Sequence, residues 1–280
     1  MAIRIISDSS TEFDLSMQEK WDIDIVPLHI FFGEEEFLDV EEIPKDKFFD
    51  MVKTHPVLPK TSQVTPFQYE KAFKKYENSG DDLIVIVASS RLTGGCMSAT
   101  IASETVSGVN IHIVDSLAAS APVAVLVETA VNLRAEGKSA QEIVDELEKI
   151  KYRLKFYAAL DSLTYLNNGG RVKGELSIKE KMTHMKPLLT ITEGKFNIFD
   201  KIKGSLQSRK HILELAEKDG IDERYTVHIY HGGCPDEVDA MLGKFAPFFQ
   251  KINYCINCMS GTLGAHFGPG TVSIGFVAKA

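Results

Sequence analysis

Hydroxyl side chains gather in four short segments of this sequence, and three of these segments directly follow an apolar run. The segments are SDSST (7–11), TSQVT (61–65), SSRLTGG (89–95) and DSLAAS (115–120). Hydroxyl groups donate hydrogen bonds, and so do the free N–H groups at the start of a helix. Together the segments predict a polar, donor-rich site that suits an anionic oxygen such as a carboxylate.

The segment TSQVT offers more hydroxyls than a helix start needs. A helix is expected over 65–76, with Pro66 in its first turn, and any hydroxyl just before it could cap that helix. Thr65 stands next to Pro66 and is the better capping candidate. That assignment leaves Thr61 and Ser62 free for a ligand.

Thr93, Gly94 and Gly95 lie between an apolar run and a predicted helix. One interpretation is an ordinary strand-to-helix turn. The other is that the glycines let backbone N–H groups approach an anion at the helix N-terminus. No G-K-[ST] follows them, so a P-loop and direct nucleotide binding are not supported.

Two basic side chains lie in glycine-rich segments. His266 is in AHFGPG, which we expect to form a turn, and Arg171 follows NNGG. A lone histidine is more often structural, but an imidazole can donate to a carboxylate and titrates near neutral pH. Arg171 either contacts an anion or a partner, or pairs with a carboxylate of the fold. Asp8 and Asp115 end predicted strands, and we interpret them as loop-shaping acceptors of backbone N–H groups.

The elements that must position these residues alternate over the first ~150 residues. Strands are expected at 3–6, 83–88 and 111–114, helices at 45–53, 65–76, 95–107, 119–136 and 140–152, and a further apolar run covers 23–32. This alternation predicts a parallel sheet with helices on its faces. In such sheets, ligands bind beyond the carboxyl ends of the strands.

The pattern changes after residue 152. We expect strands at 157–160, 225–231 and 252–259, helices near 178–185, 205–218 and 235–249, a hairpin within 186–199 and a closing strand at the end. The predicted class is therefore α/β with two lobes. The N-terminal lobe, 1–155, carries the hydroxyl-rich loops, and the C-terminal lobe, 156–280, closes over the ligand.

Composition excludes several functional classes. The net charge is −8 over 280 residues and no basic stripe occurs, which argues against nucleic acid as a partner. No segment approaches the ~20 apolar residues of a membrane span, and the start lacks a signal-peptide core, so we expect a cytoplasmic protein. Cys255 and Cys258 form C-x-x-C, but Cys96 and Cys234 supply no second ligand pair, so no metal site is predicted.

Several short segments, in order along almost the whole chain, resemble the DegV family of fatty-acid-binding proteins, which includes fatty-acid kinase binding subunits of Firmicutes. The likeness is carried by Asp8-Ser9-Ser10, Thr61-Ser62-Gln63 with Thr65-Pro66, Ser89-Ser90-x-Leu92-Thr93-Gly94-Gly95 with Ser98-Ala99, Val114-Asp115-Ser116, Leu163-x-Tyr165-Leu166 through Gly169-Gly170-Arg171, Lys186-Pro187-Leu188-Leu189 and His266-x-Gly268-Pro269-Gly270. Two departures from the family pattern are Val64-Thr65 where T-S-Q is commonly followed by P-S, and Thr93-Gly94-Gly95 where S-G-T is common.

The resemblance implies a binding protein for a long-chain fatty acid. It implies a carboxylate site made by Thr61, Ser62, Thr93, the backbone of Gly94 and Gly95, and His266, with Arg171 as a possible partner or anion contact. It further implies a separate fatty-acid kinase that uses ATP and Mg²⁺ to phosphorylate the bound acid. This chain would then carry the substrate, need no cofactor of its own and catalyse nothing.

Two alternatives stay open. A small-molecule hydrolase or transferase could use a loop serine, although the sequence has no G-x-S-x-G elbow. A lipid sensor could bind the same ligand without any kinase.

Overall fold

The apolar run LIVIVA lies at the centre of a four-stranded parallel sheet in the computed structural model, which describes residues 1–171, 184–244 and 246–280. The strand order is β2 (Ile23–Val26), β1 (Ile3–Asp8), β6 (Asp82–Val87) and β7 (Asn110–Asp115). Residues of β6 are almost entirely buried, as expected for a strand covered on both faces. The predicted parallel sheet is confirmed.

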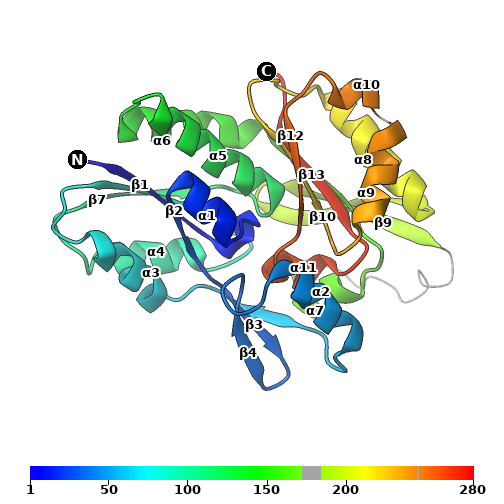
Figure 1. Ribbon diagram of the computed structural model, residues 1–280, viewed down its shortest axis with the longest axis horizontal. Coiled ribbons are helices and arrows are strands. Elements are labelled where there is room, and N and C mark those ends of the chain that lie inside the picture. Colours follow the sequence, from blue (N-terminus) through cyan, green and yellow to red (C-terminus); the bar gives the residue numbers. More distant parts are fainter. Residues whose placement is uncertain (172–183, 245) are drawn as a thin grey trace.

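Helices cover both faces of this sheet because its strands are apolar on both sides (Figure 1). On β1, Ile6 packs in a cluster with α3 (Pro66–Phe73) and α4 (Gly95–Ser103). Its neighbour Ile5 packs on the other face with α5 (Ala121–Ala135) and α6 (Ala140–Ile150). Helix α1 (Leu15–Trp21) lies on the α5 side, where Arg134 donates to the carbonyl of Trp21. Three short 3-10 helices connect these elements: η1 (Ser9–Thr11), η2 (Lys74–Tyr76) and η3 (Lys151–Arg153).

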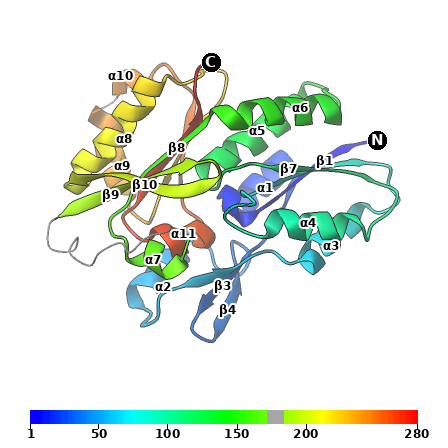
Figure 2. The ribbon, with the colours of Figure 1, turned by 180° about the vertical axis from the view of Figure 1, so that it is seen from behind.

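A second, mixed sheet of six strands forms the other lobe. Its order is β10 (Lys195–Lys203), β9 (Met185–Thr192), β8 (Leu154–Ala159), β13 (Val272–Val277), β11 (Val227–His231) and β12 (Tyr254–Cys258). One face packs against α8 (Ser205–Asp219), α9 (Pro235–Lys244) and α10 (Ala246–Phe249). Helix α5 packs on the opposite face, so it lies between the two sheets (Figures 1 and 2).

A small antiparallel sheet lies below both lobes in the view of Figure 1 and consists of β4 (Glu35–Leu38), β3 (His29–Phe32) and β5 (Lys60–Ser62). Helices α2 (Lys45–Thr54), α7 (Thr164–Gly169) and α11 (Gly261–Phe267) gather beside it. The apolar run at 23–32 forms two strands in different sheets, and Pro27 lies in the segment between them.

The turn predicted for AHFGPG is confirmed only at its end, where Pro269 and Gly270 form a turn. Ala265, His266 and Phe267 belong to α11, and all seven residues of this helix are buried. A Cβ on Gly264 would lie 2.5 Å from Phe48 and 2.9 Å from Phe49 of α2. Glycine therefore allows α11 to approach α2 closely, and the same glycines made the segment look like a turn.

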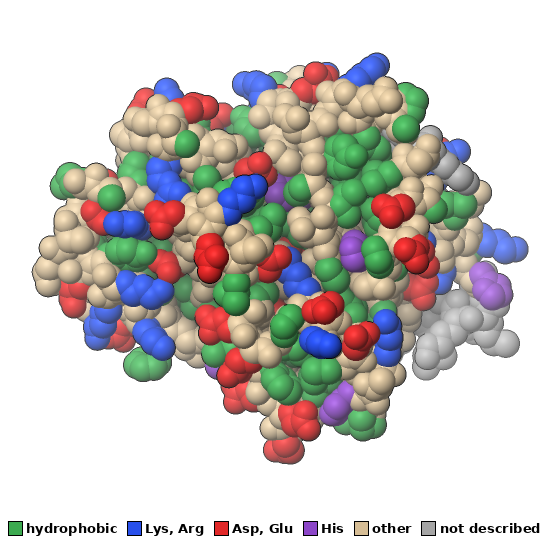
Figure 3. Space-filling view, in the orientation of Figure 1, with side chains coloured by type: hydrophobic (Ala, Val, Ile, Leu, Met, Phe, Trp, Pro, Cys, Tyr) green, Lys and Arg blue, Asp and Glu red, His purple; other side chains and the backbone are tan. Residues whose placement is uncertain are grey.

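The remaining predicted elements occur close to their expected bounds, except that the helix predicted near 178–185 lies largely outside the described residues, and β9 starts at Met185. The division into lobes at residue 155 stays a prediction, because α5 packs on both sheets and α11 packs beside the small sheet. Among the described residues, no helix combines the length and apolarity that crossing a membrane requires. Acidic and basic side chains are interspersed over the face that Figure 3 shows.

Candidate functional site

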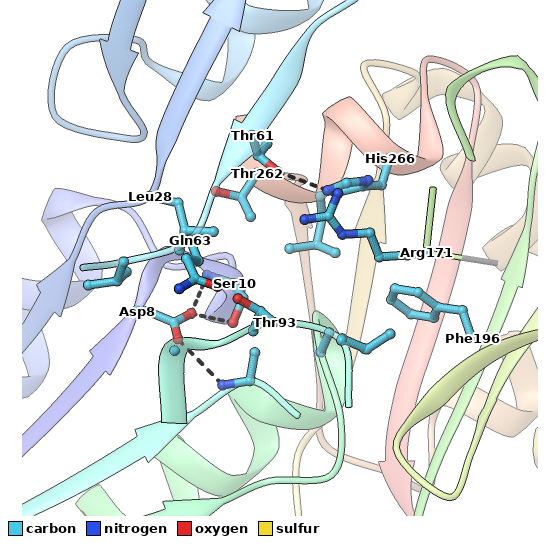
Figure 4. A pocket seen from close by; sticks show the side chains of 16 residues that line it. Asp8, Ser10, Leu28, Thr61, Gln63, Thr93, Arg171, Phe196, Thr262 and His266 are labelled. Carbon is cyan, nitrogen blue, oxygen red and sulfur yellow. Dashed lines mark hydrogen bonds between the residues drawn. The ribbon is translucent and has the colours of Figure 1, made fainter. Parts of the chain in front are cut away.

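A cavity of about 50 Å³ lies beyond the carboxyl ends of β1 and β6, where Asp8 and Ala88 form part of its wall (Figure 4). Strand β2 lies on one side of β1 in the sheet. Strand β6, which comes later in the chain, lies on the other side of β1. The carboxyl ends on either side of such a reversal leave a crevice, which is where open α/β sheets bind ligands. The small sheet and α11 close this crevice from below and contribute Thr61, Gln63 and His266.

Thr61 and His266 meet at one end of this cavity. The hydroxyl Oγ1 of Thr61 is hydrogen-bonded to Nε2 of His266 at 3.0 Å, as Figure 4 shows. Thr61 comes from β5, which is paired with β3, and His266 comes from α11 near the C-terminus. The structure thus brings together two of the residues predicted to hold a carboxylate.

The imidazole of His266 is buried, and its other nitrogen, Nδ1, has no hydrogen-bond partner among the described residues. Burial lowers its pKa to about 3, and the positive charge of Arg171 adds to the effect. His266 is therefore neutral at pH 7. A Cβ on Gly169 would lie 2.1 Å from Nδ1, so glycine at that position makes the space that the ring occupies.

Thr93 and Gly95 line the cavity, but Gly94 does not. The N–H of Gly94 donates to Oε1 of Gln63 at 2.9 Å. Gly94 was predicted to offer its N–H to the ligand, and in this structure Gln63 accepts it. Gly95 begins α4, and the first N–H groups of a helix have no acceptor within the helix.

Ser62 was predicted beside Thr61 in the site, and the structure places it elsewhere. Thr61 and Gln63 line the cavity, whereas Ser62 does not. Successive side chains of a strand point to opposite faces, and β5 includes both Thr61 and Ser62. The predicted helix cap is confirmed: the hydroxyl of Thr65 accepts the N–H of Gln68, and the Gln68 side chain accepts the N–H of Thr65.

Asp8 lies in the wall of the cavity but is occupied by the protein itself. Its carboxylate accepts the N–H of Ser10 at 2.9 Å and the N–H of Ala88 at 3.4 Å. The predicted loop-shaping role is confirmed, and Asp115 has the same role toward the N–H groups of Ser90 and Leu117. Burial raises the pKa of Asp8, which favours its neutral form and reduces its repulsion of a nearby anion.

Arg171 brings a positive charge to the same wall. Its side chain is exposed, lines the cavity and donates from Nη1 to the carbonyl of Gly169 at 2.6 Å. Figure 4 shows it beside His266. Gly169 therefore supports the site in two ways, since its carbonyl positions Arg171 and its missing side chain accommodates His266.

The rest of the lining is largely apolar and surrounds the polar end with Leu28, Val64, Ala88, Leu92, Ala119, Phe196 and Leu263. Phe196 packs on Phe267 with ring centroids 5.2 Å apart. An anionic group held at Thr61 and His266 would thus have an apolar group beside it. The geometry suits an amphiphile with a small anionic head.

Sequence reasoning missed Gln63 and Thr262. Gln63 was quoted only as part of TSQ, although period-two alternation places residue 63 on the same face as Thr61. Thr262 lies on α11, and its hydroxyl donates to the buried carboxylate of Asp39. No local signal identifies Thr262, because its place in the wall depends on where α11 packs.

In the part of the chain that the structure describes, no group of three or more His, Cys, Asp or Glu side chains could hold a metal ion. All four cysteines are free.

Known proteins resemble this chain in sequence and in fold. A family model described as "Uncharacterised protein, DegV family" matches residues 2–279. A DegV domain-containing protein of Clostridium acetobutylicum is 27% identical over 278 residues, which cover 99% of both chains. The crystal structure described as "DegV, a fatty acid binding protein from Bacillus subtilis" aligns over 100% of both chains, with 25% identity and a TM-score of 0.85.

A further solved structure is that of the Streptococcus pneumoniae fatty acid kinase (Fak) B3 protein loaded with linoleic acid. It aligns over 100% of both chains with a TM-score of 0.83 and 19% identity. At this identity the comparison shows a shared fold.

Proposed function

Since this chain belongs to the DegV family, we propose that it binds a long-chain fatty acid and holds the carboxylate in the cavity between β5, α4 and α11. The observation that carries the proposal is the pair formed by Thr61 and His266, 3.0 Å apart at the polar end of a largely apolar cavity. The fatty-acid-binding relative from Bacillus subtilis supports the ligand class.

The carboxylate would take its hydrogen bonds from the hydroxyls of Thr61 and Thr93, the N–H of Gly95 and the imidazole of His266. Each of these residues lines the cavity. The partial positive charge at the N-terminus of α4 and the guanidinium of Arg171 favour an anion there. Ser62 does not line the cavity, and the N–H of Gly94 donates to Gln63, so neither residue is part of the proposed site.

The acyl tail would follow the apolar wall past Leu263 and Phe196. Leu28, Val64 and Leu92 line the same cavity and would add apolar contacts to the tail.

The proposal includes a separate fatty-acid kinase. That partner would bind ATP and Mg²⁺ and transfer a phosphoryl group to the carboxylate, giving an acyl phosphate, while this chain presents the substrate. The likeness in fold to the Streptococcus pneumoniae fatty acid kinase B3 protein supports such a partner. The exposed side chain of Arg171, at the polar end of the cavity, is our candidate for a contact with the kinase or with the new phosphate. We place this exchange in the cytoplasm.

A hydrolase or transferase is less well supported. A hydroxyl nucleophile needs a base, and the base needs an orienting acceptor on its other nitrogen. Nδ1 of His266 has no such acceptor among the described residues. A lipid sensor would share the same binding site, so capture of partners from the native cell separates it from the carrier.

Lipid analysis of the purified protein tests the binding proposal. We expect one fatty acid per chain in an organic extract measured by mass spectrometry, and saturable rebinding of palmitic or oleic acid after delipidation. Absence of both a co-purified acid and saturable binding would overturn the proposal. Turnover of ester substrates by the isolated protein, lost on Ser90→Ala or Ser62→Ala, would favour the enzyme instead.

A further inference from the structure

A second group of reactive side chains lies away from the cavity, at the edge of the six-stranded sheet. Cys255 of the edge strand β12 is the register partner of His228 on β11. The sulfur of Cys255 lies 3.0 Å from Nδ1 of His228. The opposite nitrogen of the same ring, Nε2, lies 2.7 Å from Oε2 of Glu128 on α5.

The imidazole is held in one orientation. His228 is fully buried, and the other carboxylate oxygen of Glu128 accepts the hydroxyl of Thr226 at 2.8 Å. The hydroxyl of Tyr230 lies 3.4 Å from Nδ1 of His228. A thiol, an imidazole and a carboxylate thus stand in a chain, which is the arrangement that activates a cysteine nucleophile.

The charges around His228 favour its protonated form. Burial by itself lowers the pKa of the imidazole, but the hydrogen bonds to Cys255 and Glu128 outweigh burial and raise it to about 9. The titratable groups that act on it are therefore Cys255 from β12 and Glu128 from α5, with Tyr230 next to it on β11. Lys20 of α1 acts in turn on Glu128 and favours its ionised form.

Among the described residues, the other cysteines have no such partner. Burial raises the pKa of Cys96, Cys234 and Cys258, which keeps their thiols protonated and unreactive. Cys255 is half-buried, like the other three cysteines, and the histidine behind it is fully buried.

We propose that Cys255 is a thiolate paired with the His228 imidazolium, oriented by Glu128, and that it is a site of oxidation by hydroperoxides. The site is independent of the fatty-acid cavity and of the function proposed for it. It lies at the edge of the six-stranded sheet, where β12 leads through Met259 and Ser260 into α11.

The reaction balances without a cofactor. The thiolate attacks the terminal oxygen of a hydroperoxide, an S–O bond forms and the O–O bond breaks. The leaving alkoxide, or hydroxide from hydrogen peroxide, takes the proton of the His228 imidazolium and departs as alcohol or water. The sulfur loses two electrons and becomes a sulfenic acid, while the peroxide gains the same two electrons.

Alkylation by iodoacetamide between pH 5 and pH 10, with each cysteine quantified by peptide mass spectrometry, tests the thiolate. An ordinary thiol has a pKa of ~8.5 and is mostly protonated at pH 6. We expect Cys255 at pH 6 to react more than tenfold faster than Cys258, which lies on the same strand and serves as internal control. We expect His228→Asn to move the midpoint for Cys255 up to that of an ordinary thiol.

Treatment with hydrogen peroxide followed by dimedone tests the oxidation. We expect a dimedone adduct on Cys255 in the native protein and none on Cys258. If His228→Asn fails to fold, the thiolate absorbance at 240 nm of the native protein minus that of Cys255→Ala gives the same midpoint. A midpoint for Cys255 at or above that of Cys258, or absence of the adduct, would overturn the proposal.

Discussion

The hydroxyl of Thr61 and the imidazole of His266 are hydrogen-bonded at 3.0 Å although 205 residues separate them in the sequence. The bond joins the small sheet to α11, so the polar end of the cavity exists only once both elements have packed. The two residues also present their polar atoms to the same apolar cavity. Single substitutions of either residue can therefore test the site.

Thr61→Val removes the hydroxyl and keeps the shape of the side chain. A hydrogen bond to a charged group contributes ~1.5–3 kcal/mol, so we expect the Kd for palmitic acid to rise ~10- to 100-fold. Isothermal titration calorimetry on delipidated protein measures it. Ser62→Ala is the matched control, because Ser62 does not line the cavity. Equal effects of both substitutions would contradict the assignment of Thr61.

Gly169→Ala tests the space behind His266. The new Cβ would lie 2.1 Å from Nδ1, so the ring must move away from Thr61, and we expect fatty-acid affinity to fall more than tenfold. We also expect a loss of ~1–3 kcal/mol of unfolding free energy, because the new Cβ overpacks a buried ring.

Gly170→Ala is the control for that variant. Its φ is +65°, and a Cβ there meets nothing within 4 Å. We expect a loss of ~1–2 kcal/mol of unfolding free energy from the left-handed backbone, with affinity almost unchanged. Both variants should thus lose stability, and only Gly169→Ala should also lose affinity. If Gly169→Ala keeps the affinity of the native protein, the position of the His266 ring does not control binding.

How much of this site the sequence could predict depends on the range of the interactions. Thr93 and Gly95 follow β6 directly, so strand-end reasoning was enough to place them at the sheet edge. Thr61 and His266 were named from the family resemblance, because nothing local shows that β5 and α11 meet. Strand β5 has three residues, two of them hydroxylic, and its pairing with β3 is non-local.

The errors have physical causes of the same kind. α11 is buried all round and contains Gly261 and Gly264, so it lacks the amphipathic period by which helices are recognised. Ser62 entered the predicted site through the family resemblance, together with Thr61. Side chains alternate along a strand, so Thr61 and Ser62 of β5 point to opposite faces.

The pH dependence of stability should reveal the neutral imidazole. Between pH 6.5 and about 3 the unfolded chain protonates His266 and the unliganded folded chain does not, so stability falls as the pH is lowered through this range. Relative to His266→Gln, the native protein should lose about 3 kcal/mol between pH 6.5 and pH 4. Urea denaturation at several pH values measures the difference. If the difference in stability between the native protein and His266→Gln does not change with pH, the His266 ring is solvated.

Glu12 should produce the opposite slope. It is fully buried, and its carboxylate accepts the hydroxyl of Ser120 at 2.6 Å and the N–H of Ser260. Burial raises its pKa from 4.5 to about 7, so the folded state binds the proton more tightly than the unfolded state. This contribution is fully present below pH 4.5 and is lost as the pH rises through 7.

Glu12→Gln removes this titration, since an amide stays neutral. We expect the native protein to lose about 3 kcal/mol relative to Glu12→Gln between pH 4.5 and pH 8. Urea denaturation of both proteins across that range measures it. Parallel pH profiles for the two proteins would mean that Glu12 is ionised throughout.

The length of the fatty acid should control affinity more strongly than the head group does. Each buried methylene contributes ~0.8 kcal/mol, so a tail of ~15 methylenes contributes ~12 kcal/mol before association costs, against a few kcal/mol from the carboxylate. In a series of saturated acids from ten to eighteen carbons, we expect the Kd to fall ~fourfold with each added carbon until the tail is fully buried. Thr61→Val should shift the whole series by one constant factor, because Thr61 meets only the head. A change of slope in that variant would place Thr61 along the tail, and affinity independent of length would exclude a buried acyl chain.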